Sequence, residues 1–379
     1  MGTKQIPSLR EALAEMADFR QAQGKRYELV SVLMLACVAM MMGARSEQAI
    51  AEWGRNYGAA WLRRLGIERE RGPSQATIHR ILKGIDGGQL EAVLSRWSQA
   101  MMAAVGLPSG ELEGVAIDGK SLRGSVKQGA ADGHLLSALS HRLGLVLNQV
   151  AVSDRSNEIP HSGELLASLV LEGRVVTTDA LLTQQGVAAQ ILEQGGDYLL
   201  VVKNNQPRLR AEIELVFQTR PLRATCRSAT TTSIHGGRIE TRHLQVSDAL
   251  ADWDGWPGLQ QVLRVERTVT KKKTQATRRE VAHAICSLPP ERASAAQLLA
   301  LWRGHWRIEN QLHWVRDVTF DEDRSQVRVK RLPQVMAALR NTAIGLLRLN
   351  GAHNIAAACR RYAAQPTLAF AAFGLGLRE

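Results

Sequence analysis

Apolar residues recur every three or four positions from Ser8 to about Gly106, and this spacing predicts amphipathic helices. Four stretches carry the pattern: SLREALAEMADF, ELVSVLMLACVAMMMGA, SEQAIAEWGRNY and PSQATIHRILKGI. Ser8, Ser46 and Ser74 stand where N-cap residues belong, because a serine hydroxyl there accepts a hydrogen bond from the first helical turn. The pattern therefore predicts an all-helical N-terminal domain over residues 1–106.

The last of these stretches carries polar side chains on its faces: Gln75, Thr77, His79 and Arg80. A helix of this kind fits the major groove of DNA in the way that a recognition helix does. An ordinary packed helix explains the same pattern, so both interpretations stay open at this point.

A different pattern follows the linker GLPSGELEG. GVAIDGKSL is a short apolar run ending in Asp118, and LLSALSHRLGLVLNQVAVS predicts two strands that turn at HRLG. SGELLASLVLEG predicts a helix closed by Gly173, RVVTTDALL a buried strand carrying Asp179, TQQGVAAQILEQGG a helix and DYLLVVK a buried strand. This order predicts a mixed α/β sheet covered by helices over residues 112–205, with the first and fourth strands side by side. Asp118 and Asp179 would then lie at neighbouring strand ends, and the order matches that of the ribonuclease H type fold.

The chain then becomes rich in predicted strands: CRSATTTSI, GRIETRHLQVS, LQQVLRVERTVT and RREVAHAICSL. We interpret residues 206–290 as an inserted β-rich module. One of its turns, TKKKTQATRR, has five cations and no acid, which suits a phosphate backbone but equally a solvated hairpin tip. Helical spacing returns at Ser294, which predicts the last part of the core over 291–350 and a helical tail over 351–379.

The charge of the chain points to a polyanionic partner. Its 379 residues carry a formal net charge of +12 and give a pI of about 10.0, so nucleic acid is the first candidate and a membrane surface the second. The apolar run from Leu29 to Ala44 is shorter than the roughly 20 residues that span a bilayer, so it predicts a buried helix and no membrane insertion.

Four cysteines, Cys37, Cys226, Cys286 and Cys359, lie far apart in the sequence without CxxC spacing. This pattern indicates neither a zinc site nor a disulfide framework. We expect buried free thiols in a reducing compartment.

Two aspartates have the context of a metal site. Asp118 and Asp179 each occur in an apolar strand, where an unpaired charge is costly. A buried pair of carboxylates repels itself unless a proton or a cation lies between them, and ligands with oxygen atoms alone suit Mg²⁺ or Mn²⁺. The alternative is that each aspartate caps the turn after its strand.

A third acid, Glu309, lies in the stretch WRGHWRIENQLHWVRDVTFDEDRSQVR. On a regular helix Trp302, His305, Glu309 and Arg316 share one face, which would support a carboxylate ligand with rings and cations. A salt-bridged helix face explains the charges but not the recurrence of tryptophan and histidine. The acids of DEDRSQ, which are Asp321, Glu322 and Asp323, compete for the ligand role if the helix stops early.

The chain resembles the H-repeat-associated insertion-sequence transposases of the aspartate-aspartate-glutamate class, bacterial enzymes with a ribonuclease H type core. The resemblance rests on the ordered blocks SEQAIAEWGR, PSQATIHRIL, IDGKSLRGS, RSNEIP, TTDALLTQ, YLLVVKNNQP, HGGRIETR and RGHWRIENQLHWVRDVTFDED. It implies that Asp118, Asp179 and Glu309 are the catalytic carboxylates. The wider class often has a tyrosine, an arginine and a lysine seven before, four before and seven after the glutamate, where this chain has Trp302, His305 and Arg316.

The resemblance also implies an activity and its partners. The protein would cleave double-stranded DNA at the terminal inverted repeats of a mobile element and join the 3′ ends to target DNA, as a homodimer in the synaptic complex. Two Mg²⁺ or Mn²⁺ ions would be held by the three carboxylates. Lys120, Arg123, Lys203 and Asn205 are candidates for gripping phosphates near the metals. The expected location is the cytoplasm, at the nucleoid; an inactive DNA-binding relative and a metal-dependent endonuclease without strand transfer are the alternatives.

Overall fold

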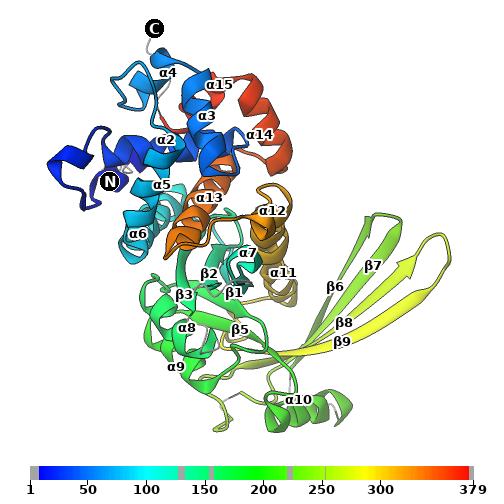
Figure 1. Ribbon diagram of the computed structural model, residues 1–379. Helices are drawn as coiled ribbons and strands as arrows, with labels where there is room; N and C mark the ends of the chain where they lie inside the picture. The colour runs from blue at the N-terminus through cyan, green and yellow to red at the C-terminus, as the bar shows by residue number, and fades with distance from the viewer. Residues whose placement is uncertain (1–7, 127–132, 153–157, 220–224, 252, 375–379) are drawn as a thin grey trace. The chain divides into compact units, whose positions relative to one another are not determined.

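The computed structural model describes residues 8–126, 133–152, 158–219, 225–251 and 253–374 (Figure 1). The chain forms two compact units. The first unit comprises Met1–Gly106, Gly119–Leu169 and Arg307–Glu379, and the second comprises Leu107–Asp118 and Val170–Trp306. The chain thus passes between the units several times, once within the strand that carries Asp118.

The N-terminal part of the first unit is helical, as predicted. Its helices are α1 (Leu9–Ala14), α2 (Leu29–Met41), α3 (Glu47–Asn56), α4 (Ala59–Arg64), α5 (Gln75–Gly84) and α6 (Gly87–Val105), with a 3-10 turn at Ala22–Gly24. The hydroxyls of Ser8, Ser46 and Ser74 accept backbone hydrogen bonds at the starts of α1, α3 and α5, so the three predicted N-caps are confirmed. Helix α2 is almost wholly buried, which explains its continuous apolar sequence.

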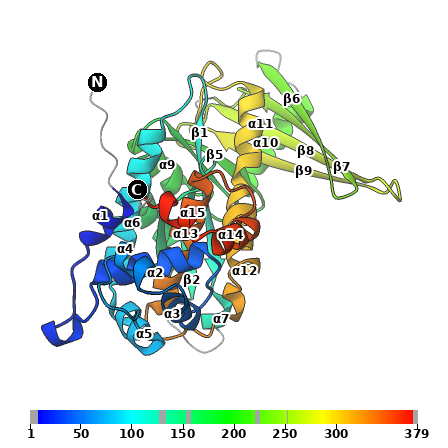
Figure 2. The ribbon, with the colours of Figure 1, turned by 90° about the horizontal axis from the view of Figure 1, so that it is seen from above.

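The remainder of the first unit combines a strand hairpin with helices. It contains α7 (Arg123–Val126), β2 (His134–Ser140), β3 (Val146–Val152), α8 (Glu158–Ala167), a π-helix (Ile308–His313), α12 (Trp314–Val318), a 3-10 turn (Glu322–Arg324), α13 (Leu332–Leu349), α14 (Ile355–Ala364) and α15 (Pro366–Ala372). Strands β2 and β3 pair antiparallel around the predicted turn. Helix α13 is buried along nearly its whole length because it packs against α2, α6 and β3 (Figure 2).

One predicted helix end is wrong. Helix α8 ends at Ala167, six residues before Gly173. Gly173 has a positive φ of 71° and lies directly before the next strand, so its conformational freedom serves the turn into that strand rather than the end of the helix.

The second unit contains a mixed sheet. Its strands are β1 (Glu113–Ser121, which belongs to this unit up to Asp118), β4 (Arg174–Thr178), β5 (Asp197–Val202), β6 (Cys226–His235), β7 (Arg238–Ser247), β8 (Gln261–Lys271) and β9 (Thr277–Cys286). They follow the order β1-β4-β5-β9-β8-β7-β6. The pairs β1/β4 and β4/β5 are parallel, and the pairs from β5/β9 onwards are antiparallel. The mixed α/β sheet and the predicted contact between the first and fourth strands are confirmed.

Three helices accompany this sheet: α9 (Gln185–Glu193), α10 (Pro207–Thr219) and α11 (Ala295–His305). Helix α11 begins at the N-cap Ser294 and packs against β4, β6 and β7. Its leucines Leu298 and Leu299 enter a core with Val175 of β4 and Leu244 of β7. The apolar core therefore fixes α11 beside the strand that precedes Asp179.

We call strands β6 to β9 the arm. Figure 1 shows these strands as two long hairpins that reach beyond the helices of their unit. Strand β9 pairs with β5, with Cys286 opposite Leu199, so the predicted inserted strands extend the same sheet.

All four cysteines are free thiols, as expected. Cys37, Cys286 and Cys359 are buried, whereas Cys226 is exposed at the start of β6, which differs from the expectation of four buried thiols. Within the described ranges, the helices include none with the length and apolar character that a membrane span requires.

Candidate active site and nucleic-acid interface

The paired stretch of β1 and β4 ends directly before two aspartates. The two strands are parallel, and their register pairs Glu113 with Arg174 and, at the other end, Ile117 with Thr178. Asp118 and Asp179 each follow the last paired residue, and both side chains are half-buried. The predicted parallel pairing that aligns the two positions is confirmed, although β1 continues beyond Asp118 to Ser121 and only β4 ends directly before its aspartate.

Asp179 also caps the turn that follows its strand. Its Oδ1 accepts a hydrogen bond from the backbone N–H of Leu181 at 3.0 Å. The capping role that the sequence left open is therefore present. A carboxylate held in this way has a fixed orientation, which a metal ligand also requires.

Asn205 supports the same turn from the loop after β5. Its side-chain amide donates to the carbonyl oxygens of Ala180, at 2.5 Å, and Thr183, at 3.5 Å. Lys203 is exposed and lines a surface hollow together with Ala180 and Asn205. Lys203 is thus available to an anion, while Asn205 contacts the backbone of the turn that carries Asp179.

The two predicted helper residues on α11 contact the sheet. His305 Nδ1 lies 3.2 Å from Thr177 Oγ1, two residues before Asp179. Trp302 is partly buried against the core of the second unit. These contacts fix the C-terminal part of α11 on its own sheet; α11 ends four residues before Glu309 in the sequence.

The regular helix assumed around Glu309 is wrong. Helix α11 ends at His305, and Ile308–His313 is a π-helix before α12 begins. A π-helix hydrogen-bonds from residue i to i+5, so the 100° spacing that placed Arg316 on the face of Glu309 does not continue through it. π-helical turns are rare in proteins overall, and a large share of those that occur lie at functional sites.

His313 is a candidate ligand that the sequence interpretation did not assign. In the first unit its Nδ1 lies 3.8 Å from Glu309 Oε2, and its side chain is buried. Burial lowers the pKa of His313, although the neighbouring Glu309 acts in the opposite direction. A neutral imidazole can bind a divalent ion, and its spacing of four residues from Glu309 was the available signal.

Arg316 has a different partner from the predicted one. Its guanidinium is fully buried and pairs with Glu322 at 2.7 Å, and Arg340 of α13 pairs with the other carboxylate oxygen at 2.8 Å. Burial alone would raise the pKa of Glu322, but the two arginines lower it below its ordinary value. Both oxygens of Glu322 are therefore engaged by arginine, which removes it as a competitor of Glu309 in this structure.

Lys120 is also paired. Its buried ammonium lies 2.6 Å from Asp317 of α12, and the more exposed Arg123 lies 3.8 Å from Asp323. Burial and the charge of Asp317 raise the pKa of Asp323. For Lys120 and Arg316 the structure thus shows a carboxylate partner instead of an open surface, whereas Arg123 remains accessible; the phosphate contacts themselves stay a prediction.

The two faces of the arm differ in charge. Alternation along the paired strands assigns one face six cations and two acids: Arg227, Arg238, Arg242, Arg267, Lys271 and Arg278, with Glu240 and Glu280. The opposite face carries two arginines, Arg264 and Arg279, and one acid, Glu266. It also carries many hydroxyl groups, among them those of Thr232, Thr241, Thr268, Thr270 and Thr277. We call the first of these the basic face. Nearer its base the same face bears Leu244 and packs on α11.

The predicted recognition helix is α5. His79 lies 3.1 Å from Glu47 of α3, so this side chain contributes to helix packing. Gln75 and Arg80 are exposed, and Thr77 is half-buried near the N-cap. Packing therefore accounts for His79, and groove binding by the exposed residues stays a prediction.

Two family profiles match the chain. The profile described as "DDE_Tnp_1-associated" matches residues 10–98, and the profile described as "Transposase DDE domain" matches residues 109–346. The "Putative transposase YncI" of Escherichia coli O157:H7 is 33% identical over 355 residues, which cover 90% of this chain and 88% of that protein. The "H repeat-associated putative transposase YhhI" of Escherichia coli K12 is 29% identical over 352 residues, covering 90% and 91% of the two chains.

The solved structures that align with the chain include one that covers most of it. It is the piggyBac transposase synaptic complex with hairpin DNA, with a TM-score of 0.40, 10% identity, and coverage of 97% of this chain and 77% of the other. The assignment of the chain rests on the family profiles and the two bacterial relatives.

Proposed function

The chain belongs to the DDE family of insertion-sequence transposases, and we propose that it cuts DNA at the ends of such an element and joins the freed 3′ ends to target DNA. The observation that supports the proposal is the parallel register of β1 and β4, in which Asp118 and Asp179 each follow the last paired residue. The net charge of +12 supports DNA as the partner.

The proposed core is of the ribonuclease H type. Three strands followed by helix, strand, helix and strand, with β4 parallel to both β1 and β5, support it. In this layout residues 112–205 and 291–350 form the core around the insertion 206–290, after the helical domain 1–106 and before the tail 351–379.

The proposed metal ligands are Asp118, Asp179 and Glu309. Two half-buried carboxylates that directly follow the paired stretch of β1 and β4 offer oxygen atoms alone, a donor set that fits Mg²⁺ or Mn²⁺. Two such ions, when bound, would supply charge stabilisation at the attacking and leaving oxygens of phosphoryl transfer. Hydrogen bonds from Leu181 to Asp179, and from Asn205 to the turn after it, orient one ligand in advance.

The basic face of the arm is the proposed surface for the DNA backbone. Its six cations outnumber its two acids, so it retains positive charge after ion pairing within the arm. Arg267, for example, pairs with both Glu240 and Glu280, while Arg238 and Lys271 lie opposite each other near the tip. Two copies of the chain, one for each end of an element, are proposed to act together.

A joining assay tests the proposal. The DNA flanking the coding region supplies candidate terminal inverted repeats, and a labelled duplex ending in that repeat is incubated with the protein, Mg²⁺ and a target plasmid. We expect labelled ends to become linked to the plasmid, and excess EDTA to abolish both cutting and joining. Cutting without joining would indicate a metal-dependent endonuclease, and binding without either reaction would indicate an inactive relative. Cutting that persists in EDTA would exclude the metal mechanism.

A further inference from the structure

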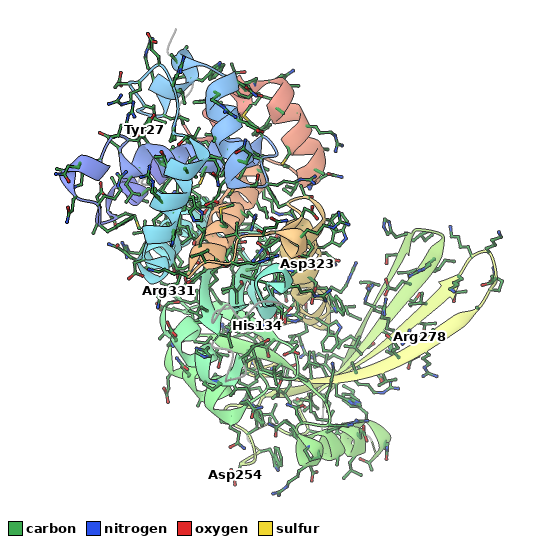
Figure 3. All side chains as sticks on the ribbon, viewed as in Figure 1. Tyr27, His134, Asp254, Arg278, Asp323 and Arg331 are labelled. Carbon is green, nitrogen blue, oxygen red and sulfur yellow. The ribbon has the colours of Figure 1, made fainter. Side chains whose placement is uncertain are left out.

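Three polar side chains meet beside the end of β1, in the first unit. Ser121 Oγ, at the last residue of β1, lies 3.0 Å from Nδ1 of His134, the first residue of β2. His134 Nε2 lies 2.8 Å from Oε1 of Glu158, the first residue of α8. Figure 3 labels His134 on the ribbon with its side chain drawn. The imidazole of His134 thus connects the start of β2 and the start of α8 to the last residue of β1.

The backbone of β1 passes this pair without room for a side chain. A Cβ atom at Gly119 would lie 2.0 Å from Glu158 Oε1 and 2.4 Å from His134 Nε2. Gly119 does not have a positive φ, so the requirement for glycine here comes from close approach rather than from backbone conformation. The pair of His134 and Glu158 therefore lies directly against the peptide that follows Asp118.

Strand alternation separates this pair from the metal ligand. Gly119 and Ser121 face His134 and Glu158, so Asp118 and Lys120 point to the other face of β1. On that face Lys120 is held by Asp317 at 2.6 Å. The end of β1 is accordingly fixed from both faces, although a strand end without such contacts would fray.

We propose that His134 and Glu158 are positioning residues that hold the end of β1 and thereby fix the Asp118 carboxylate for its ion; this inference rests on the proposed function. Metal ligands must be held within about 0.5 Å of their productive geometry. Loss of an outer partner of a ligand typically lowers metal affinity about 10–100-fold. Here the support acts through one peptide bond, because Gly119 is the residue next to Asp118.

Binding of Mn²⁺ to the whole protein without DNA tests the inference, with free Mn²⁺ followed by electron paramagnetic resonance. We expect Glu158→Ala to weaken Mn²⁺ binding about tenfold or more. Glu158→Gln retains an oxygen acceptor for the imidazole and is expected to restore most of the affinity. The matched control is Glu164→Ala, an exposed glutamate further along α8, which should bind Mn²⁺ like the parent protein.

A second variant tests the close approach itself and does not remove either partner. Gly119→Ala forces the pair away and should weaken Mn²⁺ binding to a similar extent. In the double variant Gly119→Ala with Glu158→Ala the new methyl group has space, so the two losses should not add.

The outcomes separate this inference from the proposed function. Parent-like Mn²⁺ affinity in folded Gly119→Ala or Glu158→Ala would overturn the positioning role. If Asp118→Asn loses Mn²⁺ binding in the same experiment, the proposal that Asp118 is a metal ligand still stands. Parent-like affinity in Asp118→Asn would instead overturn the metal site. If Glu158→Ala does not fold, as judged by its thermal transition, Gly119→Ala and Glu158→Gln decide the question.

Discussion

Ile117 of β1 lies beside Thr178 of β4 in a parallel register. The next residue of each chain segment is an aspartate, Asp118 or Asp179, and the parallel register places the two at the same end of the paired stretch. This relationship, together with membership of the DDE transposase family, makes the surroundings of the two aspartates the first place to test.

Asn205→Ala should slow DNA cleavage about tenfold while DNA binding stays unchanged. The variant removes the amide that holds the carbonyl of Ala180, so the turn after Asp179 gains freedom and the carboxylate is less well placed. The measurement is the cleavage rate at saturating DNA. Asn204→Ala is the control, since Asn204 contacts the side chain of Arg210 instead; an equal loss in both variants would contradict the assigned role.

Arg278 and Arg279 provide a matched pair on opposite faces of the arm. Both are largely exposed and each pairs with a glutamate, but only Arg278 belongs to the basic face. Arg278→Ala should weaken DNA binding and reduce the slope of log Kd against log salt by about 1. Arg279→Ala should leave the slope unchanged. The reverse result would assign DNA to the threonine-rich face.

Glu322→Gln should destabilise the first unit by about 3–5 kcal/mol, because it leaves Arg316 and Arg340 buried without a compensating charge. The measurement is the urea midpoint. Glu240→Gln in the arm is the control and should cost less than about 1 kcal/mol, since its ion pairs are more exposed. A small effect at Glu322 would mean that the arginines find other partners.

The ion pairs of Glu322 with Arg316 and Arg340 also make the stability of the protein depend on pH. The pKa of Glu322 lies below its ordinary value of 4.5 in the folded protein. The stability that it contributes is therefore complete above pH 4.5 and is lost as the pH falls below 4.5 towards the folded pKa. Glu322→Gln should lack this part of the acid dependence.

Glu91 should make the protein less stable as the pH rises. Burial raises its pKa to about 8, although a hydrogen bond from Gln149 and the charge of Arg316 act against the shift. Between pH 4.5 and 8 the folded chain keeps a proton that the unfolded chain has lost, so stability falls by at most about 1.4 kcal/mol per pH unit. Glu91→Gln should flatten the urea midpoint across this window. An unchanged slope would show that Glu91 is ionised in the folded protein.

The arrangement of the two aspartates was predictable from the sequence. Apolar runs of strand length alternating with helical spacing define the order of elements, and the rules of strand connection then place the first and fourth strands together. The neighbouring positions of Asp118 and Asp179 follow directly from that order of strands. The N-caps at Ser8, Ser46 and Ser74 were equally accessible, because capping is decided within one helical turn.

The surroundings of Glu309 were not predictable in the same way. Residue spacing does not distinguish an α-helix from one interrupted by a π-helical turn, so Arg316 was assigned to the wrong face. Its pairing with Glu322 depends on α13 packing nearby, a contact between residues far apart in the sequence. Likewise the contact of His134 with Glu158 across Gly119 needs three separate elements to be placed first.

The most direct test of the central claim compares DNA-end binding with DNA cleavage in Asp118→Asn. The asparagine has nearly the same size as the aspartate but lacks its charge, so the ion is lost while the fold and the DNA surface remain. We predict that end binding stays within about twofold of the parent while cleavage falls at least about a hundredfold, as for the loss of a major charge-stabilising group. Parent-like cleavage, or an equal loss of binding and cleavage, would contradict a catalytic role for Asp118.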